Sequence, residues 1–420
     1  MLLVKGDKKV INAWAFYDWA NSVYALVITT AIFPIFFDAV TDDNLQFFGV
    51  ESNNMELYSY TISFSFLVVS ILSPLLSGVA DYAGNKKYFL KSFCLLGSVS
   101  TGLLYFFSQE YLELSLLIVV MASVGFWGSI VFYNAYLPEI AEPKDHDKVS
   151  AKGYAMGYIG SSILLIFILI AYMGLGMDIK WSFPIVGVWW FGFAQITYRK
   201  LPQGNPIQEK ESGLLSKGFK ELQKVWEEIK PQKRLKTYLL SFFVFSMGVQ
   251  TVMQMATLFG IKEIDDMPDS GMIISILIIQ FVAVGGSYLF SYLSSKLGNI
   301  KALGITLIIW IGICIAAYFT HKATEFYILA GVVGLVMGGV QSLSRSTYSK
   351  LLPQTKDTAS YFSFYDVTEK IGVVIGTFAF GTIVGFTGSM RNSVFALLLF
   401  FVAGLLILAF IPREKVAKNG

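Results

Sequence analysis

Twelve long apolar stretches, separated by mostly short polar loops, constrain the fold of this chain more than any other feature. Each has 18 or more residues, the length that an α-helix needs to cross roughly 30 Å of bilayer hydrocarbon. Only 15% of the 420 residues are charged, against about 25% in an average soluble domain. The sequence therefore predicts an all-α membrane protein with twelve transmembrane helices, near residues 11–37, 57–80, 88–108, 112–137, 153–176, 181–198, 237–261, 271–295, 302–320, 324–348, 359–386 and 391–411.

Lysines and arginines are unevenly distributed between the two sides of these predicted spans. With the N-terminus in the cytoplasm, 27 of the 32 Lys and Arg residues lie on the cytoplasmic side. The outer loops hold only Lys180, Lys262, Lys322 and Arg391, and Lys370 lies within a span. Because positive charge concentrates in cytoplasmic loops, we expect both termini in the cytoplasm. The compact loops favour a bacterial inner membrane, and the N-terminus lacks the pattern of a cleavable signal peptide.

Two loop motifs recur at nearly the same interval along the chain. Gly84-Asn85 after the second span recurs as Gly298-Asn299 after the eighth, 214 residues later. Leu137-Pro138 after the fourth span recurs as Leu352-Pro353 after the tenth, 215 residues later. These offsets predict two six-helix bundles of the same topology, related by a pseudo-two-fold axis along the membrane normal.

The largest predicted cytoplasmic loop separates six spans from the other six. We expect an N-terminal bundle over residues 1–198, a linker over 199–236 and a C-terminal bundle over 237–420. Apolar residues recur in the linker at helical spacing, at Leu215, Phe219, Leu222, Trp226 and Ile229. This pattern predicts an amphipathic helix, which either connects the two halves or lies on the inner membrane surface.

The charged residues inside predicted spans include five of functional interest: Asp18, Arg345, Asp366, Glu369 and Lys370. An ionised side chain in hydrocarbon costs roughly 3 kcal/mol on insertion scales, so such residues usually face a bundle interior or a water-filled cavity. Four of the five lie on the two adjacent spans around residues 333–370. We interpret this stretch as one wall of a transport pathway.

Asp18 and Arg345 lie at similar depth on the first and tenth spans. Asp18 shares a helix face with Tyr17 and Asn21. Its carboxylate either has a structural role in helix packing or has a functional role, as a substrate ligand or a proton carrier. Arg345 lies below Gln341, and its guanidinium suits a carboxylate partner. We hypothesise that Arg345 pairs with Asp18 or with a substrate carboxylate.

Asp366 and Lys370 are spaced i, i+4 with the acid first, which is the better orientation for a helical ion pair. Lys370 either extends its ammonium towards the cytoplasm along Asp366 or takes part in function near the middle of the membrane. In the second case, Glu369 or Lys370 would change charge during a transport cycle, since burial shifts the pKa values of both groups towards neutrality.

Uncharged polar side chains in other spans suit the lining of a path for an amphiphilic solute: Tyr133, Asn134, Tyr154, Tyr158, Gln250, Gln254, Thr257 and Gln341. Taken singly, each is also explained by packing or by hydrogen bonds between helices. Gly153, Gly157 and Gly160 form a smooth stripe that predicts close helix packing.

Several longer motifs resemble one family. The segments are Trp14 to Ser22, Phe132 to Ile140, Val149 to Tyr158, Gly338 to Ser346 and Phe362 to Tyr365, together with Lys370. They resemble the vacuole effluxer-like branch of the major facilitator superfamily, the autophagy-related effluxers whose fungal members export amino acids from the vacuole. The resemblance implies the major facilitator fold.

The loop after the second span resembles the superfamily's D-x-x-G-x-K motif. The resemblance implies inner gate contacts, carried by Asp81, Gly84, Lys86 and Lys87. In the second-half copy, Ser295 stands where the motif has an acid.

The seventh span departs from the family pattern. Met247 occupies the place of an acid that this span often carries in the family. This departure argues against any coupling scheme that requires the acid at this place.

These observations favour a secondary active transporter that moves a small polar or amphiphilic solute by alternating access. Amino acids are implied by the resemblance, and proton coupling is suggested by the buried charges. A non-transporting sensor or scaffold that keeps the fold is the alternative.

The sequence has no P-loop motif, so primary pumping by ATP is unsupported. Its only histidines, His146 and His321, lie in loops, which leaves little for acid–base or metal chemistry and disfavours an enzyme. No cofactor, metal site or nucleic-acid partner is expected. The predicted partners are the solute, protons and the lipid bilayer, and the predicted state is monomeric.

Overall fold

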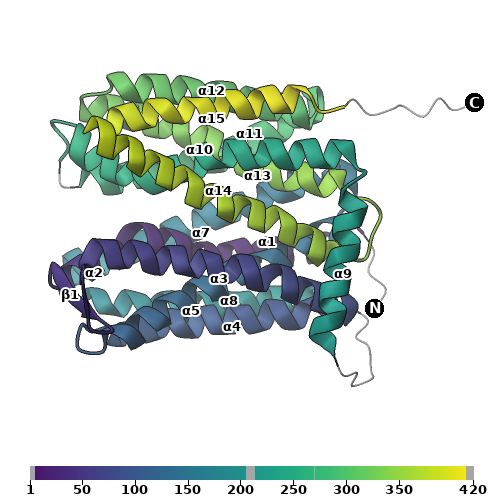
Figure 1. Ribbon diagram of the computed structural model, residues 1–420, viewed down its shortest axis with the longest axis horizontal. Helices are drawn as coiled ribbons and strands as arrows, with labels where there is room; N and C mark the ends of the chain where they lie inside the picture. The colour runs from purple at the N-terminus through teal and green to yellow at the C-terminus, as the bar shows by residue number, and fades with distance from the viewer. Residues whose placement is uncertain (1–4, 205–212, 269, 413–420) are drawn as a thin grey trace, which may run out of the picture.

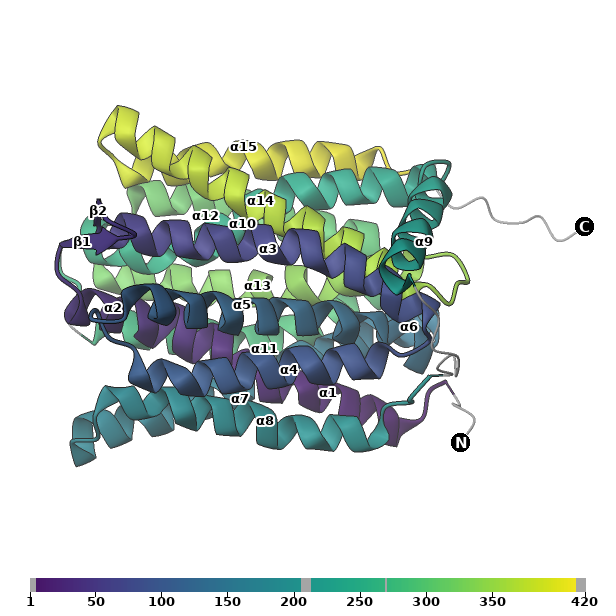
Figure 2. The same cartoon turned by 60° about the horizontal axis from the view of Figure 1, so that its bottom comes forward.

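The computed structural model describes residues 5–204, 213–268 and 270–412. The assignments of Lys210, Arg413, Lys415 and Lys418 to the cytoplasmic side lie outside the described residues. The described residues form twelve long helical segments, six in each half. Figures 1 and 2 show that these segments run roughly parallel and form two layers. The first half consists of α1 Lys8–Val23, η1 Tyr24–Ile32 and α2 Phe33–Val40 in one continuous segment, then α3 Asn54–Tyr82, α4 Lys86–Leu103, α5 Leu112–Ala135, α7 His146–Leu175 and α8 Ser182–Lys200. The second half consists of α10 Lys233–Glu263, α11 Gly271–Leu297, α12 Asn299–Phe319, α13 Ala323–Leu351, α14 Thr358–Thr387 and α15 Met390–Ala409.

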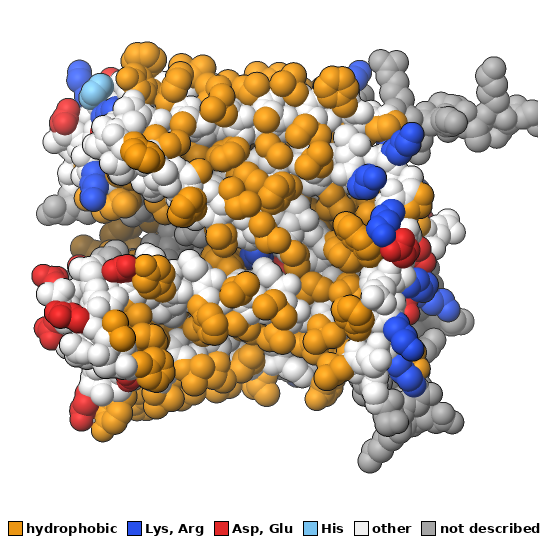
Figure 3. Space-filling view, in the orientation of Figure 1, with side chains coloured by type: hydrophobic (Ala, Val, Ile, Leu, Met, Phe, Trp, Pro, Cys, Tyr) orange, Lys and Arg blue, Asp and Glu red, His pale blue; other side chains and the backbone are white. Residues whose placement is uncertain are grey.

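The predicted helical architecture is confirmed. Within the described residues, 11 helices are long and apolar enough to cross a membrane. The twelfth predicted span corresponds to α8, which packs against α1 and α4 as the sixth member of the first half. This helix has only 19 residues, and Gln195 together with Arg199 and Lys200 in its last turn lowers its mean hydropathy. Figure 3 shows an apolar band across this face of the molecule, with most of the charged side chains gathered at its two ends.

The first span is less regular than the single helix expected for residues 11–37. Between α1 and α2, residues Tyr24–Ile32 form a π-helix. The hydroxyls of Thr29 and Thr30 each donate to the carbonyl five residues earlier, which fits the wider turn. π-helical segments are rare and occur frequently at functional sites. This segment lies beside the cavity described below.

A small β-hairpin, which the all-α prediction lacks, connects the first two spans. Strands β1 Asn44–Phe47 and β2 Val50–Asn53 pair antiparallel across a two-residue turn. Phe48 and Gly49 both have positive φ, at 46° and 78°, as a tight hairpin turn of the mirror-image type requires. Phenylalanine is an uncommon residue in that conformation, so the sequence carries no clear signal for this turn.

Helix α9 Leu214–Ile229 crosses one end of the molecule at a steep angle to the spans (Figure 2), and we call this end the α9 end. On one side it approaches α3 so closely that a Cβ at Gly78 would lie 2.2 Å from the carbonyl oxygen of Gly218. On the other side, Lys224 Nζ lies 2.9 Å from Asp357, and Tyr361 donates to Glu228. The helix therefore contacts both halves, as the connector interpretation predicts.

Short helical turns complete the described fold. They are η2 Leu104–Phe106, α6 Leu137–Ile140, η3 Pro143–Asp145 and η4 Ile179–Trp181. Glycines set the closest contact between α11 and α13, because a Cβ at Gly334 or Gly338 would lie 2.5 or 2.2 Å from a carbonyl oxygen of α11. Small residues at a helix interface allow this close approach of the two backbones.

Candidate functional site

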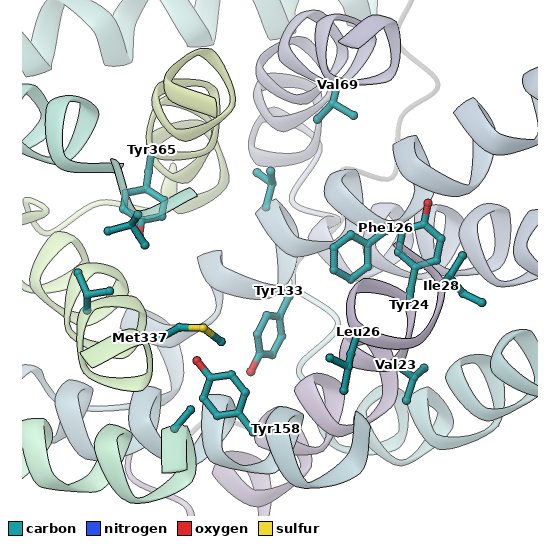
Figure 4. Close-up of a cluster of buried hydrophobic side chains, with 14 of the residues drawn as sticks. Val23, Tyr24, Leu26, Ile28, Val69, Phe126, Tyr133, Tyr158, Met337 and Tyr365 are labelled. Atoms are coloured by element: carbon teal, nitrogen blue, oxygen red, sulfur yellow. The ribbon is translucent and has the colours of Figure 1, made fainter. Parts of the chain in front are cut away.

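A central cavity of about 230 Å³ lies between the two halves. The residues that line it come from the first span, α5 and α7 of the first half and from α10, α11, α13 and α14 of the second. In Figure 4, Tyr133 and Tyr158 of the first half lie opposite Met337 and Tyr365 of the second. The polar and charged residues that line the cavity are Asp18, Asn21, Ser22, Thr30, Asn134, Tyr154, Tyr158, Ser161, Gln250, Thr257, Gln280, Gln341, Arg345, Tyr365, Asp366 and Glu369.

The Arg345 side chain crosses from α13 of the second half to the first half. Its Nη1 and Nη2 each lie 3.3 Å from Oδ2 of Asp18, so the predicted ion pair is present. Nη1 also donates to Asn134, while Nε and Nη2 donate to the hydroxyl and the carbonyl of Ser150. These five contacts match the five N–H groups of a guanidinium. We call this arrangement the Arg345 lock.

Aromatic rings enclose the Arg345 lock. The guanidinium carbon lies 4.2 Å from the ring centre of Tyr154 and 4.8 Å from that of Trp14. Tyr133 donates to Asp18 at 2.7 Å and stacks on Trp14. Such rings stabilise a buried cation through their negative faces. Trp14 and Ser150 carry no sequence signal of this role.

Gly153 is the residue of α7 that allows this close arrangement. A Cβ at Gly153 would lie 2.4 Å from Oδ2 of Asp18 and 2.8 Å from Nη2 of Arg345. The glycine stripe predicted to serve packing is thus also the surface against which the ion pair sits.

Further polar contacts join the halves between the lock and the α9 end. Ser150 donates to the Ser342 carbonyl at 2.8 Å. Asp147 of α7 accepts from Ser294, Asn299 and Lys350 of the second half, with the Lys350 contact at 2.6 Å. The sequence does not predict Asp147 as a contact between the halves, because it is one of several charges between the fourth and fifth predicted spans.

The predicted gate loop also reaches the second half. Asp81 accepts from the backbone N–H groups of Ala359 and Ser360 in the first turn of α14, where the helix dipole favours a carboxylate. Lys86 contacts Glu139 and donates to Thr358 at 2.7 Å. Gly84 has a φ of 64° in the turn between α3 and α4.

Lys87 occupies a different position from the one predicted. Its Nζ donates to the Leu201 carbonyl at 2.8 Å, after the end of α8 in the same half. It therefore makes no recorded contact with the second half within the described residues.

A second ionic group lies on α14, on the opposite wall of the cavity. Lys370 Nζ lies 3.1 Å from Asp366 and 2.9 Å from Glu369, and 3.6 Å from the ring centre of Trp127 in the first half. Glu369 also accepts from Gln250 at 2.7 Å. We call Asp366, Glu369 and Lys370 the α14 cluster.

The Lys370 ammonium lies along Asp366, as one of the two interpretations suggested, but the side chain is only 1% exposed and Glu369 holds it as well. Trp127, its partner in the first half, was not predicted. On α10, Gln250 lies about one helical turn after Met247 and donates to Glu369.

Eight of the eleven predicted site residues line the cavity: Asp18, Asn21, Asn134, Gln250, Gln341, Arg345, Asp366 and Glu369. Tyr133 and Lys370 do not line it but hold residues that do. Tyr17 is buried behind the cavity, where its ring packs against those of Tyr133 and Tyr198. Among the described residues, there is no cluster of His, Cys, Asp and Glu side chains able to hold a metal ion.

Comparisons with known proteins agree with this architecture. A Bacillus subtilis protein described as an uncharacterised MFS-type transporter, YxiO, is 33% identical to this chain, covering 98% of it and 97% of the relative. Autophagy-related protein 22 of Yarrowia lipolytica is 23% identical, covering 89% of this chain and 78% of its own length.

Solved structures share the fold at low sequence identity. The crystal structure of the major facilitator transporter FucP in its outward conformation matches 97% of this chain and 99% of its own, with a TM-score of 0.70 and 13% identity. A bacterial homologue of the iron transporter ferroportin in an outward-facing state matches with a TM-score of 0.67 over 97% of this chain and 99% of its own, also at 13% identity.

The family model described as vacuole effluxer Atg22 like matches residues 6–420. The match therefore extends over both halves, the linker and every residue of the cavity. The chain belongs to the vacuole effluxer Atg22-like family within the major facilitator superfamily, and it is a membrane transporter rather than an enzyme.

Proposed function

We propose that this protein is a secondary active transporter that moves a small polar or amphiphilic solute by alternating access of its two halves. The observation that carries this proposal is the Arg345 lock at the edge of the central cavity. Arg345 of the second half is held entirely by Asp18, Asn134 and Ser150 of the first. Breaking these contacts would open the cavity towards the α9 end.

The positions of the contacts define the proposed cycle. The lock, the contacts of Asp147 with its three partners, and the contact of Asp81 of α3 with the first turn of α14 all lie between the cavity and the α9 end. The excess of Lys and Arg in loops on that side supports a cytoplasmic α9 end. In this orientation the present conformation is closed to the cytoplasm, and transport requires these contacts to break as the halves rock.

Proton coupling gives the lock a role in the cycle. Protonation of Asp18 would remove the negative charge that holds Arg345, which would then retain only neutral partners. Removing one charge of a buried ion pair leaves the other charge uncompensated and is strongly destabilising, so a proton on Asp18 favours separation of the halves. The α14 cluster supplies a second set of groups that can exchange a proton, namely Asp366, Glu369 and Lys370.

Amino acids are the first substrate class to test, because the family is described by its vacuolar effluxers. A bacterial inner membrane is the proposed location, in line with the Bacillus subtilis relative.

One chain supplies both walls of the cavity, so a monomer suffices. The proposed units remain residues 1–198, 199–236 and 237–420.

The test is uptake and counterflow in proteoliposomes with a panel of labelled amino acids, with and without an imposed pH gradient. Saturable flux that follows the gradient and falls in Asp18→Asn and Lys370→Gln supports a proton-coupled carrier with these residues on its path. Glu227→Gln is a suitable control, because this α9 carboxylate is mostly exposed and distant from the cavity lining.

Other outcomes of the same experiment separate the alternatives. Gradient-independent flux would indicate a facilitator and refute proton coupling. Absence of flux for every solute tried, in protein that is folded and inserted, would favour the sensor or scaffold alternative.

A further inference from the structure

The two ionic groups of the cavity differ in their balance of charge. In the Arg345 lock, one cation faces one carboxylate, Asp18. In the α14 cluster, the single cation Lys370 is shared by two carboxylates, Asp366 and Glu369. With every group in its usual ionised form, the cavity therefore carries one uncompensated negative charge, on the α14 side.

The two groups also differ in hydrogen bonding. Asp366 is 3% exposed and lines the cavity, and its Oδ2 atom has no hydrogen-bond partner within the described residues. Its Oδ1 atom lies 3.1 Å from Lys370. A buried carboxylate oxygen without a partner costs free energy until a donor reaches it. Glu369, whose side chain is 20% exposed, lines the cavity as well.

Arg345, by contrast, has no donor left for a solute. Its five N–H groups are directed at Asp18, Asn134 and Ser150. While the lock is closed, a solute carboxylate would have to displace Asp18 in order to bind this guanidinium. The cavity thus offers an anionic acceptor on α14 and no free cationic donor among its described charged groups.

We propose that the α14 cluster is a binding subsite for a protonated amine, and that the amine rather than a carboxylate is the group by which this cavity recognises its solute. The ammonium is placed against the carboxylates of Asp366 and Glu369, with the aromatic Tyr365 beside them in the lining. Three N–H donors of an ammonium suit these acceptors. The proposal rests on the proposed transport function and names the chemical class of its substrate.

Three matched compounds with the same alkyl group test this directly: leucine, 3-methylbutylamine and 4-methylpentanoate. Their binding to the purified full-length protein is measured by the shift of its melting temperature with ligand concentration. We expect the amine to bind at least as tightly as leucine, and the acid to give no saturable shift. Binding of the acid, or failure of the amine to bind, overturns the proposal.

Variants of the cluster give a readout that a purely structural role would not produce. Glu369→Gln removes the excess charge and is expected to weaken amine binding by about tenfold or more, since hydrogen bonds to charged groups are among the strong ones. The double variant Glu369→Gln/Lys370→Gln restores one net negative charge, on Asp366, and is expected to regain most of the amine affinity. Amine affinity that is unchanged in the single variant, or not regained in a folded double variant, contradicts the proposal.

Controls separate this inference from the proposed function. Glu227→Gln, on the exposed face of α9, keeps the wild-type affinity for the amine. Melting without ligand reports the folding of each variant, and the three-compound comparison needs no variant at all. Amino-acid flux without amine binding refutes the subsite alone, whereas amine binding without flux of any solute refutes the transport proposal alone.

Discussion

The Arg345 lock and the α14 cluster both place charges in the middle of the protein, but they use them differently. Every N–H group of Arg345 has a partner, and rings of Trp14 and Tyr154 cover its faces. The α14 cluster holds two carboxylates for one lysine and leaves Asp366 Oδ2 without a partner. A saturated ion pair has little left to offer a ligand, so it suits a contact between moving halves. An unsaturated cluster retains free energy that a ligand can release, so it suits binding.

The largest expected effect comes from breaking the saturated side. Arg345→Met leaves Asp18 buried without its cation, and removal of one partner of a buried pair costs about 3–5 kcal/mol. We expect a marked fall in melting temperature and loss of flux. The double variant Asp18→Asn/Arg345→Met removes both charges and should recover most of the thermal stability while transport remains lost. Equal melting temperatures in the single and double variants would show that the lock is not a coupled pair.

A substitution at Gly153 tests how tightly the Arg345 lock is packed against α7. In Gly153→Ala the new methyl group would lie 2.4 Å from Oδ2 of Asp18, which forces the ion pair to move. Overpacking of this kind costs about 1–3 kcal/mol, measured as a lower melting temperature and reduced flux.

Gly174→Ala is the matched control on the same helix, because a Cβ at Gly174 has nothing within 4 Å. Alanine is the better helix former by about 1 kcal/mol, so this variant should be neutral or slightly stabilising. Similar losses at both positions would mean that α7 is sensitive to any change, and not to contact with the lock.

The lock and the cluster were predictable from sequence to different degrees. Charges in apolar segments have few acceptable environments, so the spans, Asp18, Arg345 and the Asp366–Lys370 pair followed from composition and helical spacing. The side chains that complete each group did not. Trp14, Trp127 and Ser150 are ordinary residues for a membrane helix, and only the folded arrangement brings them to a cation.

Local backbone features were also beyond the sequence argument. The π-helix of Tyr24–Ile32 has the same apolar composition as an α-helix, and the turn at Phe48 lacks the usual Asn-Gly signal. Lys87 belongs to the gate motif, but its hydrogen bond to the Leu201 carbonyl depends on the path of the chain after α8. In each case tertiary contacts decide a matter that local sequence leaves open.

Trp127 tests whether the α14 cluster also links the two halves. Its ring centre lies 3.6 Å from Lys370 Nζ across the boundary between α5 and α14. Trp127→Leu removes this cation–π contact, which is worth about 0.5–2 kcal/mol, and we expect a moderate fall in flux with altered affinity for amines. Trp127→Phe keeps an aromatic face and should lie between wild type and the leucine variant. Identical behaviour of the two variants would assign Trp127 to packing alone.

The smallest effect is expected at α9, where charges pair at an exposed surface. Hydrogen bonds from Lys224 to Glu221 and Asp357 hold the pKa of its ammonium above the usual lysine value. Because that pKa is raised in the folded state, the contact contributes fully at neutral pH and is lost only as the pH rises through the raised value. The side chain is 52% exposed, and exposed pairs contribute about 0–1 kcal/mol and are screened by salt.

Lys224→Gln should therefore lower the melting temperature slightly in low salt, by an amount that does not change between pH 6 and pH 9. This difference in melting temperature from the wild type should vanish in high salt. A loss comparable to that of Arg345→Met would mean that the connector, and not the saturated lock, holds the halves together at this end.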